Sequence, residues 1–271
     1  MNSPTPNPEP SSSTNQQAVL LIDMGNTKSK LALAQNGHLI SPVDLVDHEV
    51  TLSHALALAH QTQNNVHACL ISSVAAGTQS IVDGLLDQGL PTLALSANMA
   101  LPFVIDYATP NTLGSDRIAG AAGAYAAMGQ SAALIIDAGT AITYDFLSAN
   151  GHFQGGAISP GVRMRFKALH AFTAQLPLCT PRTANVPTIG TDTKQAIMAG
   201  VMNGVWAEVD FFINNFRLQN PNAPVFLAGG DGEYFDLTAK KSIFARPNLV
   251  LEGLALIADM NFDAIKRSLI H

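Results

Sequence analysis

The feature of this 271-residue sequence that most limits its fold is a short strand–turn–strand pattern that occurs twice. Residues 19–40 read VLLIDMGNTKSKLALAQNGHLI, and residues 133–154 read ALIIDAGTAITYDFLSANGHFQ. Aligned without gaps, the two segments agree at 8 of 22 positions. The matching pairs are Leu20/Leu134, Ile22/Ile136, Asp23/Asp137, Gly25/Gly139, Leu33/Leu147, Asn36/Asn150, Gly37/Gly151 and His38/His152. A single Asp-x-Gly could simply be the tight turn of a β-hairpin. Two copies, each followed by an Asn-Gly turn at the same spacing, indicate a duplicated unit.

Each copy predicts the same local structure. A buried strand (19–22 or 133–136) meets a tight Asp-x-Gly turn, and a second strand leads to Asn-Gly, the strongest short hairpin signal. A third strand would begin at His38 or His152. Helical spacing follows at 53–61, 78–88, 116–128, 193–216 and 249–260, with further strands at 68–74 and 224–228. The pattern predicts two similar α/β domains with a central cleft.

Composition narrows the function classes. The chain is 47% hydrophobic and 13% charged, with a net charge of -6, and no Lys/Arg run could follow a nucleic-acid backbone. Its two cysteines have no metal or redox spacing. Residues 1–17 are rich in Ser, Pro, Asn and Thr and lack the pattern of a signal peptide, so we expect a disordered tail. No apolar run reaches the length of a membrane span, and we expect a cytoplasmic protein that contacts neither nucleic acid nor membrane.

The two turns carry residue types suited to phosphate. Gly25 and Gly139 lack a Cβ atom, so backbone N–H groups can approach phosphate oxygens closely. Asn26, Thr27 and Thr140 add neutral donors, and Asp23 and Asp137 end their strands where a carboxylate can hold hydrated Mg²⁺ or another cation. Lys30 is suited equally to a phosphate contact and to an exposed position on its strand. There is no G-x-x-x-x-G-K-[ST] segment, which excludes a P-loop fold.

A Gly-Ser-Asp-Arg stretch, residues 114–117, lies between the two turns at the start of an alanine-rich helix. Ser115 or Asp116 could be a plain helix N-cap. Asp116 could also accept a proton from an attacking hydroxyl, while Arg117 could grip an anionic substrate group. We favour the functional interpretation, and the two roles can coexist. Two glycine-rich segments, 155–161 and 228–231, permit close backbone approach to a ligand but are weak signals alone.

Taken together, these motifs resemble those of type III pantothenate kinases, which belong to the acetate kinase, sugar kinase, Hsp70 and actin superfamily and are related to Bvg accessory factors. The resemblance runs from about residue 19 to the last helix. It implies a duplicated ribonuclease H-like (actin-like ATPase) fold with a nucleotide cleft, divided into 18–128 and 129–271. It also implies ATP-dependent phosphorylation of pantothenate to 4'-phosphopantothenate, the first step of coenzyme A biosynthesis.

The resemblance implies a role for each matching residue. Asp116 is the expected proton acceptor. The expected ATP and phosphate site comprises Asp23, Met24, Gly25, Asn26, Thr27, Lys28, Ser29, Lys30 and Thr140. The expected pantothenate site comprises Tyr107, Gly114, Ser115, Asp116, Arg117 and Thr193, with Thr191 as an alternative to Thr193. Asp23 is expected to hold Mg²⁺ through water, and Asp137 a monovalent K⁺ or NH₄⁺.

The family's members are usually homodimers, and helix 193–216 could form part of such an interface or serve only as a core helix. Two other functions stay open on sequence grounds. One is a kinase of the same fold acting on a sugar, acetate or polyphosphate, and the other is a regulatory protein that uses the nucleotide pocket as a sensor.

Overall fold

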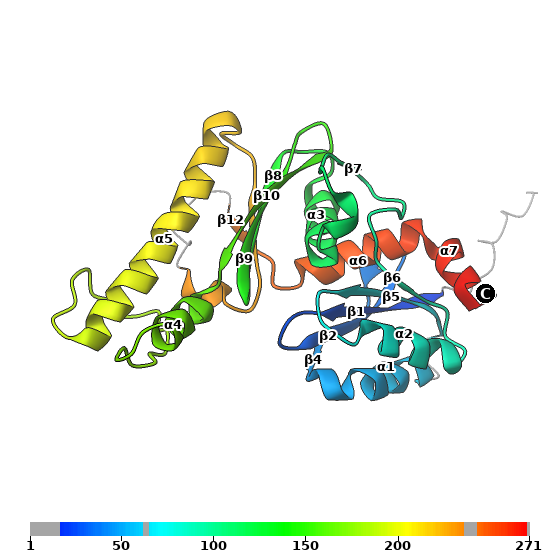
Figure 1. The fold of residues 1–271 in the computed structure, drawn as a ribbon. Helices are drawn as coiled ribbons and strands as arrows, with labels where there is room; N and C mark the ends of the chain where they lie inside the picture. The colour runs from blue at the N-terminus through cyan, green and yellow to red at the C-terminus, as the bar shows by residue number, and fades with distance from the viewer. Residues whose placement is uncertain (1–16, 62–64, 236–242, 270–271) are drawn as a thin grey trace, which may run out of the picture.

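The computed structural model describes residues 17–61, 65–235 and 243–269 (Figure 1). The predicted tail therefore lies outside the described residues, apart from Gln17. Two mixed sheets form the frame of the molecule, and helices lie between them and on their outer faces (Figure 1).

The first sheet is built around β1 (Ala18–Met24). Its order is β3-β2-β1-β5-β6, with β2 (Ser29–Gln35), β3 (His38–Leu39), β5 (Val66–Ser73) and β6 (Thr92–Ala94). The short strand β4 (Asp44–Val46) also pairs with β2. β2 runs antiparallel to β1, whereas β5 and β6 continue the sheet in parallel. Helices α1 (Thr51–His60) and α2 (Thr78–Asp87) cover the outer face (Figure 1).

The second sheet repeats this order around β8 (Ala133–Ala138). It runs β12-β11-β8-β9-β10, with β9 (Ala141–Leu147), β10 (His152–Pro160), β11 (Val225–Ala228) and β12 (Ile243–Ala245). Strand β7 (Val104–Ile105) adds to β10. Again the second strand is antiparallel to the first, and the two strands on the other side are parallel. The predicted duplication of an α/β unit is confirmed by this matching strand order and direction.

The repeat is not gapless in three dimensions. Asp23 pairs with Lys30 across the first hairpin, seven residues on, whereas Asp137 pairs with Thr143, six residues on. The second Asp-x-Gly turn is therefore one residue shorter. The following turn restores the alignment, because Ala34 pairs with Leu39, five residues on, whereas Leu147 pairs with Phe153, six residues on. The match of Leu33 with Leu147 was thus a wrong structural equivalence, since Leu33 occupies the place of Phe146.

Two helices lie between the sheets and join the halves (Figure 1). Helix α3 (Ser115–Met128) contacts β8 and β9 of the second sheet and β5 of the first, and α6 (Leu249–Met260) contacts β1, β2, β3 and β5 of the first sheet. The C-terminal half therefore supplies a helix that covers the first sheet, whereas α3 packs against strands of both sheets. The two helices touch through small residues: a Cβ atom at Gly253 would overlap the backbone of Ala119, and one at Gly123 would overlap Leu249.

The outer face of the second sheet is covered by α4 (Val162–Ala171) and the long α5 (Thr193–Gln219) (Figure 1). By length and composition alone, α5 could cross a membrane. However, Met202, Val205, Val209 and Ile213 are fully buried against the second sheet. This one-sided burial is that of a core helix. A short helix, α7 (Phe262–Lys266), follows α6.

Candidate active site

In the first Asp-x-Gly turn, the residues at the tip are exposed and polar, whereas the residues that flank the tip are buried. Residues 25–28 connect β1 to β2, and Gly25 N–H donates to the Lys28 carbonyl at 3.1 Å. Asn26, Thr27 and Lys28 are exposed, and Lys28 pairs with Asp47 at 3.4 Å. The side chains of Met24 and Ser29 point into the protein instead, where Thr51 donates a hydrogen bond to Ser29 at 2.8 Å. These two residues can therefore offer a phosphate only their backbone.

The second turn is tighter and is covered by glycine backbone. Gly139 N–H donates to the Ala141 carbonyl at 2.9 Å, and Thr140 is exposed. Gly161 N–H donates to the Thr140 carbonyl at 3.0 Å, and a Cβ at Gly161 would overlap this turn. Gly229 has a φ of +88°, and a Cβ there would overlap Asp137 Oδ1. Both glycine-rich segments, 155–161 and 228–231, therefore contact the second turn through a glycine. Each segment was a weak signal in the sequence, and the structure brings the two together.

Three candidate carboxylates, Asp23, Asp116 and Asp137, interact electrostatically from three different elements. Burial, then the charge of Asp137, raises the pKa of Asp23 to about 7. Burial, then the charge of Asp116, raises the pKa of Asp137 to about 6. Lys30 lowers both pKa values, and its Nζ donates to the Pro247 carbonyl at 2.7 Å, immediately before α6. Each of these carboxylates is affected by the negative charge of another, and a bound cation would relieve this repulsion.

The carboxylates of Asp23 and Asp137 are suited to hold a cation that is also bound by a phosphate. The described part of the chain contains no group of three or more His, Cys, Asp or Glu residues that could enclose a metal. Mg²⁺ needs no such group, because one or two carboxylates, water and substrate phosphates complete its shell. Asp23 and Asp137 supply two buried carboxylates with raised pKa values, so the donor set fits a cation that arrives with a phosphate ligand.

The start of α3 is fixed by Ser115. Its hydroxyl donates to the Ser73 carbonyl at 3.0 Å and accepts from the Ser73 N–H at 2.9 Å, which ties the helix to the end of β5. The N-cap position belongs to Gly114, and no side chain caps the helix. Ser115 is therefore not a plain N-cap. A Cβ at Gly114 would lie 2.5 Å from Asp116 Oδ1, so the glycine leaves the space that the Asp116 carboxylate occupies.

Asp116 is the carboxylate beside this fixed point. Its Oδ1 accepts the Arg117 N–H at 2.8 Å. Burial raises the pKa of Asp116 above its ordinary value, while the N–H and the charge of Arg117 oppose the rise. A raised pKa brings a carboxylate closer to the range in which general bases work at neutral pH.

Arg117 and Tyr107 lie together in the interior. The guanidinium is 7% exposed and lies 5.7 Å from the centroid of the Tyr107 ring. Arg117 Nε donates to Asp145 Oδ1 at 2.8 Å, and Nη2 donates to the same oxygen. Sequence reasoning missed Asp145. The available signal was a carboxylate in the apolar β9, at the place that Ala32 occupies in β2.

Thr193 lies in a different region. It is the exposed first residue of α5, whose start lies beside α4 on the outer side of the second sheet (Figure 1). Asp192 caps this helix by accepting the Gln195 N–H at 2.8 Å, and Thr191 donates to the Gln195 side chain at 3.2 Å. The geometry within one chain does not group either threonine with the three aspartates.

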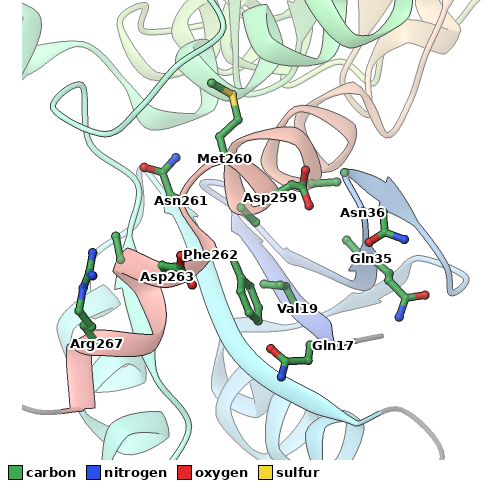
Figure 2. A pocket seen from close by; sticks show the side chains of 15 residues that line it. Gln17, Val19, Gln35, Asn36, Asp259, Met260, Asn261, Phe262, Asp263 and Arg267 are labelled. Atoms are coloured by element: carbon green, nitrogen blue, oxygen red, sulfur yellow. The ribbon is translucent and has the colours of Figure 1, made fainter. Parts of the chain in front are cut away.

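A separate groove of about 660 Å³ lies between the β1–β2 hairpin and the α6–α7 segment (Figure 2). Asp259, Asp263 and Arg267 are among its lining residues, and Val19 and Phe262 add an apolar part (Figure 2). None of the residues predicted for ATP, substrate or cation lines this groove. We therefore place the candidate site at the two Asp-x-Gly turns and the start of α3.

Solved structures share the overall fold. A putative Baf family transcriptional activator from Campylobacter jejuni aligns with a TM-score of 0.58 and 20% identity, covering 90% of this chain and 99% of that one. The activator of 2-hydroxyisocaproyl-CoA dehydratase from Clostridium difficile, with bound ADPNP, aligns with a TM-score of 0.53 and 14% identity, covering 93% and 96%. At these identities the likeness concerns the fold, which is the duplicated actin-like ATPase fold expected from the sequence.

Sequence comparison is more specific. The family model described as type III pantothenate kinase matches residues 19–215. A type III pantothenate kinase from Christiangramia forsetii is 38% identical over 245 residues, which cover 89% of this chain and 98% of that protein. One from Bacteroides fragilis is also 38% identical, over 242 residues, with the same coverage. With its two Asp-x-Gly turns, its Gly-Ser-Asp-Arg helix start and this extent of similarity, the chain belongs to the type III pantothenate kinase family.

Proposed function

We propose that this protein transfers the γ-phosphoryl group of ATP to the primary hydroxyl of pantothenate and so forms 4'-phosphopantothenate in coenzyme A biosynthesis. The observation that carries the proposal is that the charge of Asp116 acts on both Asp23 and Asp137, which supports a candidate base that works together with the two candidate phosphate turns. The proposed ATP site is the turn 23–30 together with Thr140. The proposed pantothenate site is Tyr107 and the segment 114–117, with Thr193 as a further candidate.

In the proposed reaction, Asp116 accepts the proton of the attacking hydroxyl. Exposed Asn26, Thr27 and Thr140 orient phosphate oxygens, and Lys30 adds a positive charge. Mg²⁺, held through water by Asp23, and K⁺ or NH₄⁺ at Asp137 would supply neutralisation of phosphate charge when bound. Because phosphoryl transfer passes through a loose transition state, positioning and charge neutralisation contribute most of the acceleration.

A coupled ADP-release assay tests the proposal. Purified protein with Mg²⁺-ATP should release ADP when pantothenate is added, and phosphopantothenate should be found by mass spectrometry. A panel of acetate, glucose and polyphosphate serves as the substrate control. ATP binding without pantothenate turnover would support a nucleotide sensor instead. Replacing K⁺ by Na⁺ should lower turnover if Asp137 holds a required monovalent cation.

The role of Asp116 has its own test. Asp116→Asn removes the proton acceptor while keeping the shape of the side chain, so kcat should fall by about 10²–10⁴-fold. ATP binding, followed by calorimetry, should change little, because the phosphate turns are intact. Near-normal turnover of a folded Asp116→Asn protein would remove Asp116 from the mechanism.

A further inference from the structure

A further buried carboxylate, that of Asp145, pairs with the residue that follows the candidate base and has no part in the proposed reaction. Asp145 is 1% exposed, and its Oδ1 accepts from both Nε and Nη2 of Arg117. The guanidinium also lies 5.7 Å from the ring centroids of Tyr107 and Phe153. A buried guanidinium held in this way has a fixed position.

Four elements cooperate to build this cluster. Arg117 comes from α3, Asp145 from β9, Phe153 from β10, and Tyr107 from the segment after β7. The β9–β10 register shifts between Phe153 and Gly156, as in a β-bulge. Within the bulge, Gly155 has a φ of +92°, and a Cβ there would lie 3.2 Å from the Tyr107 ring. The bulge and its glycine thus make room for Tyr107 beside Arg117.

The ion pair between Arg117 and Asp145 affects the neighbouring carboxylate of Asp116. Arg117 follows Asp116 directly, and its charge acts on the Asp116 carboxylate. A buried guanidinium requires a negative partner, because an unpaired buried charge is costly. With Asp145 present, both donors that Arg117 directs to a carboxylate go to Asp145. Without Asp145, Asp116 is the adjacent carboxylate that would take its place.

We propose that Asp145 is a positioning residue for phosphoryl transfer: by holding Arg117 between Tyr107 and Phe153, it keeps the Asp116 carboxylate unpaired and available to the acceptor hydroxyl. This inference rests on the proposed function. It also gives Arg117 a structural task beside its proposed place in the pantothenate site, because two of its donors go to Asp145.

The test is Asp145→Asn, which keeps the size of the side chain and removes its charge. We expect kcat to fall by about 10²-fold, since small misplacements of a catalytic group cost this much. The KM for ATP should stay within about 3-fold, because catalytic misplacement leaves ground-state ATP binding nearly unchanged. This split separates positioning from general destabilisation.

The pH profile provides a second readout. The charged groups around Asp116 are Asp23, Asp137, Arg117 and Asp145, with Lys30 facing the first two. Loss of the Asp145 charge lowers the pKa of Asp116 in two ways: it removes a neighbouring negative charge, and it leaves Arg117 to stabilise ionised Asp116. The acid limb of kcat/KM should therefore move to lower pH. An acid limb that does not move would contradict the inference.

Two further variants control for folding and for loss of any ion pair. The double variant Arg117→Gln/Asp145→Asn has no unpaired charge, and its acid limb should return toward that of the unmodified protein. Glu252→Gln breaks an ion pair of similar geometry, in which Arg246 Nη2 lies 2.6 Å from Glu252, and should leave the limb and kcat unchanged. Melting curves show which variants are folded.

A folded Asp145→Asn protein with an unchanged kcat and acid limb would overturn the inference. If the unmodified protein does not phosphorylate pantothenate, the proposed function fails, but the inference is still tested. In that case the Asp116 carboxyl is titrated by ¹³C NMR, with Asp116→Asn used for assignment. The Asp116 pKa should be lower in Asp145→Asn than in the unmodified protein, and equal values would overturn the inference.

Discussion

The aspartate of the first turn, Asp23, makes the folding stability of the protein depend on pH. Burial and the charge of Asp137 raise the pKa of Asp23 from 3.8 to about 7. The folded state therefore holds a proton that the unfolded state releases between about pH 4 and 7. Stability falls as pH rises through this range, because the folded state binds more protons than the unfolded state.

We predict that Asp23→Asn stabilises the ligand-free protein at pH 8 by about 1–3 kcal/mol, because the cost of a buried, repelled carboxylate is removed. The advantage should shrink toward pH 5, where Asp23 is protonated in the folded state. Calorimetric melting from pH 5 to 8, without nucleotide, measures both effects. Identical pH slopes for the two proteins would contradict the assigned pKa. The variant should also bind Mg²⁺-ATP more weakly, which separates stability from function.

At the same scale, the motif residues could be predicted from sequence but their partners could not. Asp23 and Asp137 stand out because each ends a predicted strand two residues before a glycine, and Asp116 because it starts a predicted helix two residues after one. Asp145 does not stand out, since its function depends on Arg117, 28 residues away, and on a bulge in β10. The hydrogen bonds between Ser115 and Ser73 could not be predicted from the sequence either, because they join two separate elements, α3 and β5.

At the scale of elements, hydrophobic spacing predicted the central strands and five helices close to their observed limits. Helix 249–260 was predicted to the residue. The two- and three-residue strands β3, β4, β6, β7 and β12 are too short to carry a period, and of these only the start of β3 was predicted. The position of α3 and α6 between the two sheets could not be predicted either, because periodicity identifies an apolar face but not the surface that it covers.

The α3–α6 crossing leads to a prediction for Gly253. A Cβ at this position would overlap the Ala119 carbonyl and approach the Gly123 nitrogen to 2.6 Å. Gly253→Ala should therefore lower the free energy of unfolding by about 1–3 kcal/mol, the usual cost of overpacking. Urea unfolding followed by circular dichroism measures this loss.

Gly204 provides the matched control. It is also a helical glycine, in α5, but a Cβ there would meet no atom within 4 Å. Gly204→Ala should leave stability unchanged or raise it by up to about 1 kcal/mol, because alanine favours helix more than glycine does. If both variants shifted stability by the same amount and sign, helix propensity rather than the crossing would explain the result.

At the scale of the whole molecule, the outer side of α5 carries two large apolar side chains that are exposed in the single chain. Phe211 is 62% exposed and Leu218 is 81% exposed. They lie seven residues apart and so share one face of the helix, while the opposite face is buried in the second sheet. Phe211 rests edge-on against Phe212 at 5.4 Å between ring centroids, which holds it outward. Exposed apolar faces of this kind favour a protein partner.

We propose that a second copy of the chain covers this face, which is the homodimer expected from the family resemblance. Phe211→Glu should weaken self-association by about 30-fold or more, the size of a hot-spot loss of about 2 kcal/mol. Light scattering during size-exclusion chromatography should then find a dimer for the unmodified protein and a monomer for the variant at the same concentration.

Leu45→Glu alters a residue of similar exposure, 58%, on β4 and should leave the dimer intact. A dimer that survives Phe211→Glu but not Leu45→Glu would place the interface on the first sheet. A monomeric unmodified protein would contradict the proposed homodimer.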